Sequence, residues 1–592
     1  MFETQPDADR EALLEDRLRR LYGNAEALPR FRRLIDRWRG PVRAALGGDG
    51  SRERPELTER DVVLIAYPDH LLRGGEAPLA TLGRWCREHV QGLVSTVHVL
   101  PYHPSTSYEG YSIRDYTAVD PALGSREDLA HLARDFRLMV DLVLNHCSAS
   151  HPWFGQFLDD REPGRRYVLT VADPAAAWLQ SVRRARDMPL VHSFETAAGR
   201  RHVWTTYSPD LIDLDWREPG VCLEFLEIML DAVVLGARTV RLDAFAYAWK
   251  EAGTGCVALP ATHELLRLLQ EALRQAGAGE VALLPSITNT TQADNYSYLG
   301  LGEPVRQADL VYHLPLSGLL LLALYEEDAQ VLSRWLTGLP EAPAGRAYFN
   351  VSATHDGIGL TWLDGLIPEE SIRALVADAV ARGARVSSRR PTATGESHPW
   401  EINATWFSAC AGASADEQVA RLLATQSVVL SLRGVPALYL PVLLAAQNDE
   451  RRVEATGDNR AINRGRLEAG RWETAVADEG SVEARTLSGM KRLLRARRTT
   501  PAFHPEGAQR VLDSGAREVL ALERTPPGGV PGGRQSVLCL TNFSARPKRV
   551  RPAQGARGEE WRDLLTGETG RWEGDLELAP HQARWMATRH GN

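Results

Sequence analysis

Lysine and cysteine are scarce in this chain of 592 residues. Lysine occurs only at positions 250, 491 and 548, so arginine carries nearly all of the positive charge. The six cysteines are scattered and include no Cys-x-x-Cys pair, so neither a disulfide framework nor a cysteine-bound metal is expected. Motifs for a nicotinamide, a nucleotide or a metal are also missing. We therefore expect a protein that works without a metal or other cofactor.

Long apolar segments are absent as well. No run is long enough to span a bilayer, and residues 1–20 are acidic and polar where a signal peptide would be apolar. The net charge of −8 argues against nucleic acid as a partner, because surfaces that bind nucleic acids are basic. We therefore expect a cytoplasmic protein with neither membrane nor nucleic acid as a partner. The pattern does not indicate its oligomeric state.

Eight β-rich runs alternate with helical stretches. The runs are nearly continuously apolar, which is typical of parallel strands buried on both faces. Eight strand–helix units predict an α/β fold of the closed (β/α)₈ type, a TIM barrel. The eight runs are residues 62–68, 95–104, 138–146, 239–245, 281–287, 308–316, 347–356 and 434–441.

Three further segments flank or interrupt this pattern. Apolar residues at helical spacing predict helices over residues 8–48, within an N-terminal helical segment of residues 1–58. The barrel is expected over residues 59–510, with an inserted subdomain at 147–205 after the third strand. Short alternating strands joined by Gly- and Pro-rich turns predict a C-terminal β-sandwich domain over residues 511–592.

Polar residues stand where several predicted strands end. Asp243 lies near the end of the fourth run, two residues after Arg241, and Asp356 ends the seventh. His146 ends the third run, and Ser286 lies near the end of the fifth. In a closed barrel of this type the chemistry is carried by the carboxyl ends of the strands, so these residues are the candidate site.

The motifs around these residues resemble those of the α-amylase superfamily of glycoside hydrolases, and more narrowly of its sucrose phosphorylase branch. The resemblance covers roughly residues 60–510. The N-terminal helices and the motif PWEIN resemble the glucosylglycerate phosphorylase relatives in particular. The stretches that carry the resemblance are DLVLNH (141–146), VWTTYSPDLIDLDWREP (203–219), VRLDAFAYAWKEAGTG (240–255), ATHDGIG (353–359), SLRGVPALYL (431–440) and GDNRAINR (457–464).

The resemblance implies a role for each candidate residue. It makes Asp243 the nucleophile that forms a glucosyl ester, with Arg241 holding its carboxylate ionised. It makes Asp356 the carboxylate that stabilises the positively charged transition state. The remaining candidates are implied to bind sugar hydroxyls, and they are Asp69, His146, His355 and Arg464.

One expected group is missing. Cleavage of a glycoside with retention uses two carboxyl groups, a nucleophile and a general acid/base. The resemblance places a Glu just after Pro285, but Ser286 stands there, and a hydroxyl does not donate its proton near neutral pH. The nearest later carboxylates, Asp294 and Glu303, lie beyond the strand end. The turn before the predicted third strand, which the resemblance implies to be DDG or DRG, reads YEG here (108–110), which puts the acceptor site in question.

Two functions remain open at this point. The first is a retaining α-glucoside phosphorylase that forms α-glucose 1-phosphate from inorganic phosphate and either sucrose or a glucosylglycerate-like glucoside, through an ester on Asp243. The second is a catalytically impaired homologue that binds a glucoside or a sugar phosphate, because Ser286 replaces the acid/base. Whether Ser286 is natural or was introduced to trap a substrate is also open.

Overall fold

The computed structural model describes most of the chain, and its residues fall into two compact units. The first unit comprises Met1–Glu56 and His98–Val311, and the second comprises Leu57–Val97 and Tyr312–Asn592. The boundaries predicted at residues 58 and 510 are not tested by this division and stay predictions. The described residues are 7–47, 52–107, 109–184, 188–286, 290–301, 307–389, 398–528, 535–551 and 558–589.

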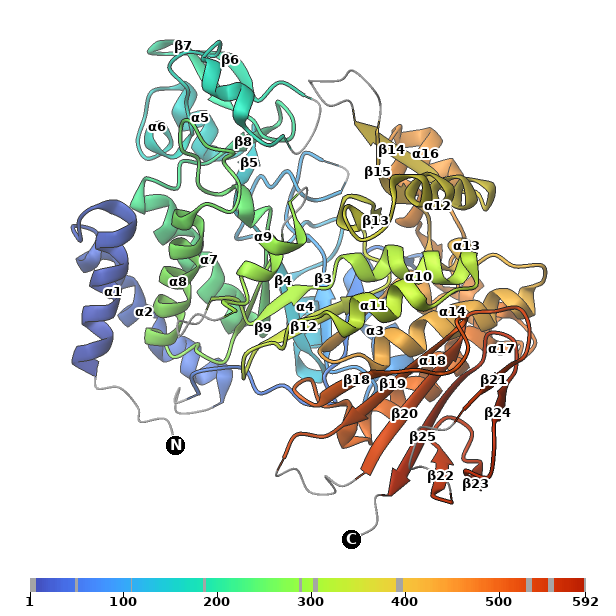
Figure 1. Cartoon of the computed structure of the whole chain (residues 1–592). Coiled ribbons are helices and arrows are strands. Elements are labelled where there is room, and N and C mark those ends of the chain that lie inside the picture. Colours follow the sequence, from blue (N-terminus) through green and yellow to red (C-terminus); the bar gives the residue numbers. More distant parts are fainter. Residues whose placement is uncertain are drawn as a thin grey trace. The chain divides into compact units, whose positions relative to one another are not determined.

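Eight strands form one parallel sheet in the order β10-β9-β4-β3-β1-β16-β12-β11, labelled in part in Figure 1. Just before β11, the Asp309 amide donates to the carbonyl of Leu283 in β10 over 3.1 Å, and the Leu283 amide donates to the Asp309 carboxylate over 2.8 Å. The two ends of the strand order are thus joined, which confirms the predicted (β/α)₈ barrel. The strands are β1 (Val63–Ala66), β3 (Thr96–Val99), β4 (Arg137–Val143), β9 (Ala237–Asp243), β10 (Ala282–Pro285), β11 (Leu310–Tyr312), β12 (Ala347–Val351) and β16 (Val435–Tyr439).

All eight predicted runs contain a strand. Seven of the strands are shorter than their runs, and β9 is as long as its run but begins and ends two residues earlier. The run 308–316 ends in helix, because Pro315 occupies the first turn of α10 (Pro315–Glu326), where its missing N–H is not needed. In the run 347–356, strand β12 stops at Val351 and the remainder is a loop that carries His355 and Asp356. The prediction therefore located the strands correctly and included the loops that follow them.

In the first unit, the N-terminal helices pack on barrel helices. The predicted helices over residues 8–48 are α1 (Asp7–Tyr22) and α2 (Leu28–Leu46), which contact α8 (Pro260–Gln275) and α7 (Pro219–Leu235). Figure 1 shows the two N-terminal helices in blue beside the green barrel helices. A buried ion pair of 2.8 Å joins Arg17 of α1 to Glu264 of α8. Outside the segment between β4 and α7, the other helices of this unit are α4 (Arg126–Asp135) and α9 (Gln292–Ser297), with the 3₁₀ turn η2 (Phe245–Tyr247).

The segment between β4 and α7 has its own small core. Trp204 is buried there with Leu169, Leu179 and Leu190, and Cys256 from the loop after β9 joins them. The elements of this segment are β5 (His146–Ser148), α5 (Pro152–Leu158), α6 (Gly164–Tyr167), η1 (Ala177–Ser181), β6 (Val191–Thr196), β7 (Gly199–Trp204) and β8 (Leu211–Asp213).

In the second unit, the barrel strands are accompanied by helices and by two small sheets. The small sheets have the strand orders β13-β15-β14 and β17-β2. The helices are α3 (Pro78–Val90), α11 (Gln330–Thr337), α12 (Glu369–Ala381), α13 (Trp406–Ala409), α14 (Ala415–Ser431), α15 (Leu440–Leu443), α16 (Glu450–Thr456), α17 (Ala469–Ala477) and α18 (Val482–Arg498), with the 3₁₀ turns η3 (Thr361–Leu363), η4 (Asn459–Asn463) and η5 (Pro501–Phe503). The small-sheet strands are β2 (Leu71–Leu72), β13 (Ile358–Gly359), β14 (Arg385–Arg389), β15 (His398–Asn403) and β17 (Leu467–Glu468).

The C-terminal strands form an antiparallel β domain. A six-stranded sheet has the order β18-β19-β20-β25-β22-β23, and a two-stranded sheet pairs β21 with β24. Residues of both sheets share one core, in which Leu540 and Met586 lie with Val550 and Leu578. Figure 1 shows these strands in orange to red. They are β18 (Ala508–Leu512), β19 (Val519–Thr525), β20 (Gln535–Asn542), β21 (Lys548–Val550), β22 (Glu560–Asp563), β23 (Thr569–Arg571), β24 (Leu576–Leu578) and β25 (Ala583–Arg589).

Two buried arginines of the second unit cap the C-terminal end of α14. Arg497 of α18 and Arg524 of β19 donate to the carbonyls of Leu430 and Ser431, in the last turn of α14. Those carbonyls have no partner inside the helix, so the guanidinium groups supply the missing donors. None of the helices among the described residues is long and apolar enough to cross a membrane.

Candidate active site

The strand registers of the first unit bring four polar residues together. Asp141 of β4 lies opposite Arg241 of β9 in the parallel pair, and Val143 lies opposite Asp243. Because side chains alternate along a strand, Arg241 and Asp243 project to the same face. Strand β10 pairs with β9 on the other side, and Ser286 directly follows its last residue.

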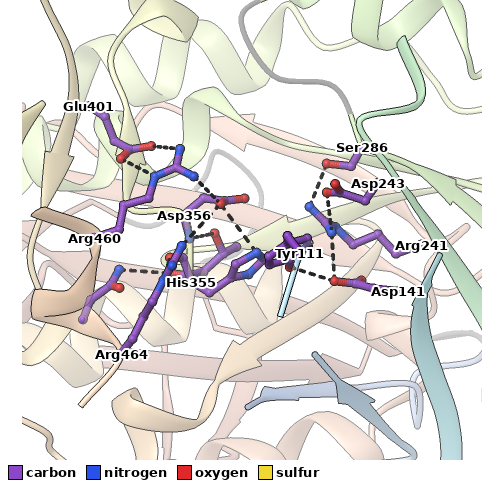
Figure 2. Close-up of polar contacts among 12 residues, drawn as sticks. Tyr111, Asp141, Arg241, Asp243, Ser286, His355, Asp356, Glu401, Arg460 and Arg464 are labelled. Atoms are coloured by element: carbon purple, nitrogen blue, oxygen red, sulfur yellow. Dashed lines mark hydrogen bonds and ion pairs between the residues drawn. The ribbon is translucent and has the colours of Figure 1, made fainter. Parts of the chain in front are cut away.

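Arg241 is the centre of this group. Its Nη1 lies 3.0 Å from Asp141 Oδ2 and 2.9 Å from Asp243 Oδ1, and its Nη2 donates to Ser286 Oγ over 2.8 Å. Figure 2 shows the guanidinium between Asp141 and Ser286. We call Asp141, Arg241, Asp243 and Ser286 the Arg241 cluster. A rigid guanidinium with several donors holds carboxylates in fixed orientations, so it positions the Asp243 carboxylate.

Asp141 is the least exposed carboxylate of the cluster. Its side chain is fully buried, and it accepts hydrogen bonds from His98 Nε2 over 2.7 Å and from the Tyr111 hydroxyl over 2.8 Å. A buried carboxylate is stable only when its oxygens are paired or hydrogen-bonded, and both oxygens are satisfied here. By contrast, the Asp243 side chain keeps 16% of its surface exposed. Of the two carboxylates that pair with Arg241, only Asp243 is therefore open to a substrate.

The backbone turns sharply after Asp243. Ala244 has a φ of 52°, in the left-handed region, which costs a residue with a Cβ about 1–2 kcal/mol. The turn directs the chain into η2, and the Phe245 amide donates to the carbonyl of Ser286 over 3.1 Å. The Ser286 amide in turn donates to the Leu242 carbonyl over 2.9 Å. Backbone strain beside the candidate nucleophile is typical of functional sites, where the surrounding contacts hold it in place.

His146 is linked to the same cluster through Tyr111. The His146 Nε2 lies 3.2 Å from the Tyr111 carbonyl, and its Nδ1 lies 3.3 Å from the Asn145 amide nitrogen. These partners correspond to the neutral tautomer that carries its proton on Nε2. Behind His146, Lys250 donates to Asn145 and Asp213 over 2.7 and 2.5 Å. One of the three lysines of the chain thus holds together Asn145, next to His146, and Asp213, which lies opposite His146 in the β5–β8 pair.

A second cluster lies in the other unit, around Arg460 in η4. Its Nη1 donates to Asp356 Oδ1 over 2.9 Å, while its Nε and Nη2 bind the two oxygens of Glu401 over 2.9 and 2.7 Å. Figure 2 shows this bidentate pair and the bond to Asp356. We call Asp356, Glu401 and Arg460 the Arg460 cluster. Burial raises the pKa of Glu401, although the charge of Arg460 opposes the shift.

Arg464 and His355 lie beside this second cluster. The Arg464 Nε donates to the His355 carbonyl over 2.8 Å, and its Nη2 lies 3.9 Å from Asp356 Oδ1. The His355 Nε2 lies 3.5 Å from the same carboxylate oxygen. Asp69, which the resemblance implies to bind sugar hydroxyls as Arg464 does, forms an ion pair with Arg466. The hydroxyl contact itself is not tested by these contacts and stays a prediction.

His70, which follows Asp69 in the chain, connects the segment after β1 to β16. His70 Nδ1 accepts a hydrogen bond from the Tyr67 amide over 3.1 Å, and His70 Nε2 contacts the Tyr439 hydroxyl over 3.2 Å. The Tyr439 hydroxyl donates to the Asn463 carbonyl over 3.0 Å. Burial, with nearby Arg452 acting in the same direction, lowers the pKa of His70 to about 3. His70 is therefore neutral at physiological pH. Through Tyr439 it connects the segment that carries Asp69 with the segment that carries Arg464.

Asp294, the later carboxylate that the structure describes, offers no replacement acid. Asp294 caps α9 together with Thr291, and it forms an ion pair of 3.0 Å with Arg183. Burial opposes ionisation, but the hydrogen bonds from Thr291 and the charge of Arg183 outweigh it and lower the pKa of Asp294. An acid with a lowered pKa is ionised at neutral pH and has no proton to donate. Glu303 lies outside the described residues, and so does Tyr108 of the turn YEG.

The structure groups the predicted residues within each unit. Asp243, Arg241 and Ser286 meet in the first unit, and Asp356, His355 and Arg464 meet in the second. Sequence reasoning did not single out the partners of these residues, although most of them lie in or beside quoted motifs. Asp141 begins DLVLNH, Glu401 lies in PWEIN and Arg460 lies in GDNRAINR. A buried charged residue needs a partner of opposite charge. Charged residues inside these motifs could therefore have been predicted to pair with one another.

Comparisons with known proteins agree with this arrangement. Residues 90–303 match the family model described as "Alpha amylase, catalytic domain". The chain is 38% identical to a glucosylglycerate phosphorylase of Allomeiothermus silvanus over 91% of this chain and 93% of that protein. It is 31% identical to a sucrose phosphorylase of Agrobacterium vitis over 75% of this chain and 89% of that protein.

A solved structure supports the same assignment. The sucrose 6F-phosphate phosphorylase of Thermoanaerobacter thermosaccharolyticum is 25% identical and superimposes with a TM-score of 0.70, covering 82% of this chain and 94% of that one. The chain therefore belongs to the α-amylase family, in its branch of glucosylglycerate and sucrose phosphorylases.

Proposed function

We propose that the chain is a retaining α-glucoside phosphorylase whose Asp243 exchanges a glucosyl group with phosphate. The relatives named above are phosphorylases of glucosylglycerate and of sucrose, which supports this class of reaction. The observation that carries the proposal is the Arg241 cluster. It keeps a partly exposed, oriented carboxylate at Asp243 and places a serine at the neighbouring strand end.

The exchange takes two displacements. In the first, an oxygen of the Asp243 carboxylate attacks C1 of α-glucose 1-phosphate, a bond forms between them, and the C1–O bond to phosphate breaks. The ester reacts with one proton on its phosphate group, so phosphate departs with the electron pair as HPO₄²⁻ and takes no proton from the protein. In the second, a phosphate oxygen attacks C1 of the glucosyl ester and releases Asp243. Both steps invert C1, so the α configuration is retained.

The same site handles ordinary glucosides less well. An alcohol leaves as an alkoxide unless a general acid protonates it, and Ser286 does not supply that proton. A positioned general acid contributes about 10²–10⁴-fold, or roughly 3–5 kcal/mol of the activation barrier. We therefore propose that cleavage of a glucoside is slowed by about this factor relative to the same site with a glutamate at position 286.

The remaining candidate residues receive the roles that the resemblance implies. Asp356 stabilises the positive charge of the transition state, and His146, His355, Asp69 and Arg464 bind sugar hydroxyls. For the second substrate we propose glycerate before fructose, because the relatives of higher identity are glucosylglycerate phosphorylases. We further propose that the protein works in the cytoplasm.

An isotope exchange experiment tests the proposal. The protein is incubated with α-glucose 1-phosphate and labelled inorganic phosphate, and label in glucose 1-phosphate is measured over time. Exchange that is abolished in Asp243→Asn supports the proposal. No exchange in the wild-type protein, or equal exchange in Asp243→Asn, contradicts it. Asp36→Asn, the same substitution at an exposed position of α2, is the control for nonspecific effects.

A second function is favoured by Ser286 itself. A homologue without the acid/base binds a glucoside or a sugar phosphate without turning it over. Calorimetric binding of glucosylglycerate or glucose 1-phosphate, combined with neither exchange nor release of glucose 1-phosphate, supports this alternative and rejects the first.

A further inference from the structure

A hollow on the second unit lies among helices that carry none of the candidate catalytic residues. Its volume is about 850 Å³, and it is lined by residues of α14, α17, the turn after α17, α18 and the last turn of α3. That volume is within the range of pockets that hold metabolite-sized ligands, about 300–1,000 Å³. The wall consists mainly of α18, whose residues face it at helical spacing from Ala484 to Arg495.

The rim of this hollow is strongly basic. Arg485, Lys491, Arg492 and Arg495 line it, against one carboxylate, Glu479. Arg485 forms an ion pair of 2.8 Å with Asp416. For Lys491, Arg492 and Arg495, no carboxylate lies within ion-pair distance in the part of the chain that the structure describes. Three neighbouring cations without a carboxylate partner contrast with the chain as a whole, whose net charge is −8.

The clustering of positive charge on α18 destabilises this helix. Lys491 and Arg495 are four residues apart on α18, and Arg492 and Arg495 are three apart, so like charges stand next to each other on one helix face. Such pairs of like charge destabilise a helix. Burial, together with the charge of Arg495, lowers the pKa of Lys491, in agreement with this unfavourable environment. A bound anion would neutralise these charges and remove the cost.

The inner surface adds apolar and aromatic contacts. Val419 and Leu487 are buried and line the hollow with the half-buried Leu423. His89 lines it as well, and its Nε2 is buried without a hydrogen-bond donor or acceptor among the described residues. Burial, followed by the charge of Lys491, lowers the pKa of His89, so its imidazole is neutral at physiological pH. An apolar base with a cationic rim suits a small organic molecule that carries several negative charges.

We propose that this hollow binds a small phosphorylated metabolite, with Lys491, Arg492 and Arg495 contacting its phosphate groups. Arginine and lysine are the side chains that bind phosphate oxygens through charge-assisted hydrogen bonds. The concave shape and the volume favour a small molecule over an extended acidic peptide or a flat lipid surface. The site is separate from the residues that we assign to glucosyl transfer.

Binding is tested with two probes, pyrophosphate and fructose 1,6-bisphosphate, by isothermal titration calorimetry on the full chain at a constant ionic strength of about 0.15 M. We expect at least one probe to bind, and the double variant Lys491→Gln/Arg495→Gln to bind it about ten- to a hundredfold more weakly, because two charge-assisted contacts are lost. The matched control is Arg334→Gln/Arg373→Gln, which removes the same charge from exposed helix positions that do not line the hollow.

The outcomes separate the proposal from its competitors. The proposal is supported if the rim variant binds the probe more weakly and the control variant binds it with unchanged affinity. Lys491→Arg, which keeps the charge, should bind the probe like the wild type. Absence of binding at millimolar concentrations of both probes overturns it. Equal weakening in both double variants also overturns it, since this points to nonspecific attraction. Binding of polyglutamate or anionic vesicles in place of the probes assigns the surface to a macromolecule and rejects the metabolite.

Discussion

Arg241 donates from Nη2 to the hydroxyl of Ser286 over 2.8 Å while its Nη1 contacts the carboxylate of Asp243. One guanidinium therefore connects the candidate nucleophile with the position where the family resemblance calls for a general acid. A Glu at position 286 would act as a general acid only where it stays protonated, so its carboxyl group must lie out of hydrogen-bond reach of Arg241, whose charge favours the ionised form.

Restoring that group should increase the cleavage of glucosides. We expect Ser286→Glu to raise the rate of phosphorolysis of glucosylglycerate or sucrose by about 10²–10⁴-fold, because a general acid then protonates the departing alcohol. Release of glucose 1-phosphate measures the rate. Ser286→Gln has nearly the same shape and no acidic proton, and it should give no such gain. If the two variants behave alike, proton donation does not limit this protein.

Removing the nucleophile should stop glucosyl transfer. We expect Asp243→Asn to reduce phosphate exchange by more than about 10³-fold, because an amide does not form the ester. The wild-type protein, quenched after incubation with glucose 1-phosphate, should show a mass increase of one anhydroglucose unit on the peptide that contains Asp243. An adduct on another peptide would place the nucleophile elsewhere.

The buried carboxyl group of Glu401 should make stability depend on pH. Burial raises its pKa in the folded state, so between the unfolded and folded pKa values the folded state binds more protons than the unfolded state. Its contribution to the free energy of unfolding therefore falls as the pH rises through this window. We expect the wild-type protein to gain stability relative to Glu401→Gln when the pH is lowered from about 7 to about 5.

Urea denaturation at the two pH values measures this difference. Glu369→Gln, which removes an exposed carboxylate on α12, is the control for the loss of one acidic group. An opposite trend, with Glu401→Gln gaining on the wild type at the lower pH, would show that Glu401 is stabilised as an anion by Arg460.

The buried arginine of β19 should be needed for stability. Arg524 donates to the carbonyls of Ser431, His504 and Ala508 and has no exposed surface. We expect Arg524→Lys to lower the free energy of unfolding by about 2–4 kcal/mol, because a compact ammonium group does not reach all of these acceptors. Arg510→Lys, at an exposed position of β18, should change it by less than about 0.5 kcal/mol. Equal effects of the two substitutions, measured by chemical denaturation, would contradict this assignment.

The elements of the barrel could be read from the sequence with few errors. Buried parallel strands are continuous apolar runs, and all eight runs contain a strand. The runs were too long because the residues after each strand are also partly apolar, as in 308–316, where Pro315 begins a helix. In the C-terminal domain strands were predicted over residues 517–524, 536–544, 548–553 and 571–580. Strands β18, β22 and β25 were missed, because strands with one exposed face give a weaker pattern than continuous apolar runs.

The sequence by itself determined the barrel, the family resemblance and the absence of a carboxylate at position 286, since each depends on residue type and order along the chain. Only the tertiary structure decided which charges meet. Arg241 contacts Asp141 across 100 positions, and Arg460 contacts Asp356 across 104. Such pairs depend on strand register and on the paths of loops. A buried charged residue in the sequence indicates that a partner is needed, but the identity of that partner is set by the fold.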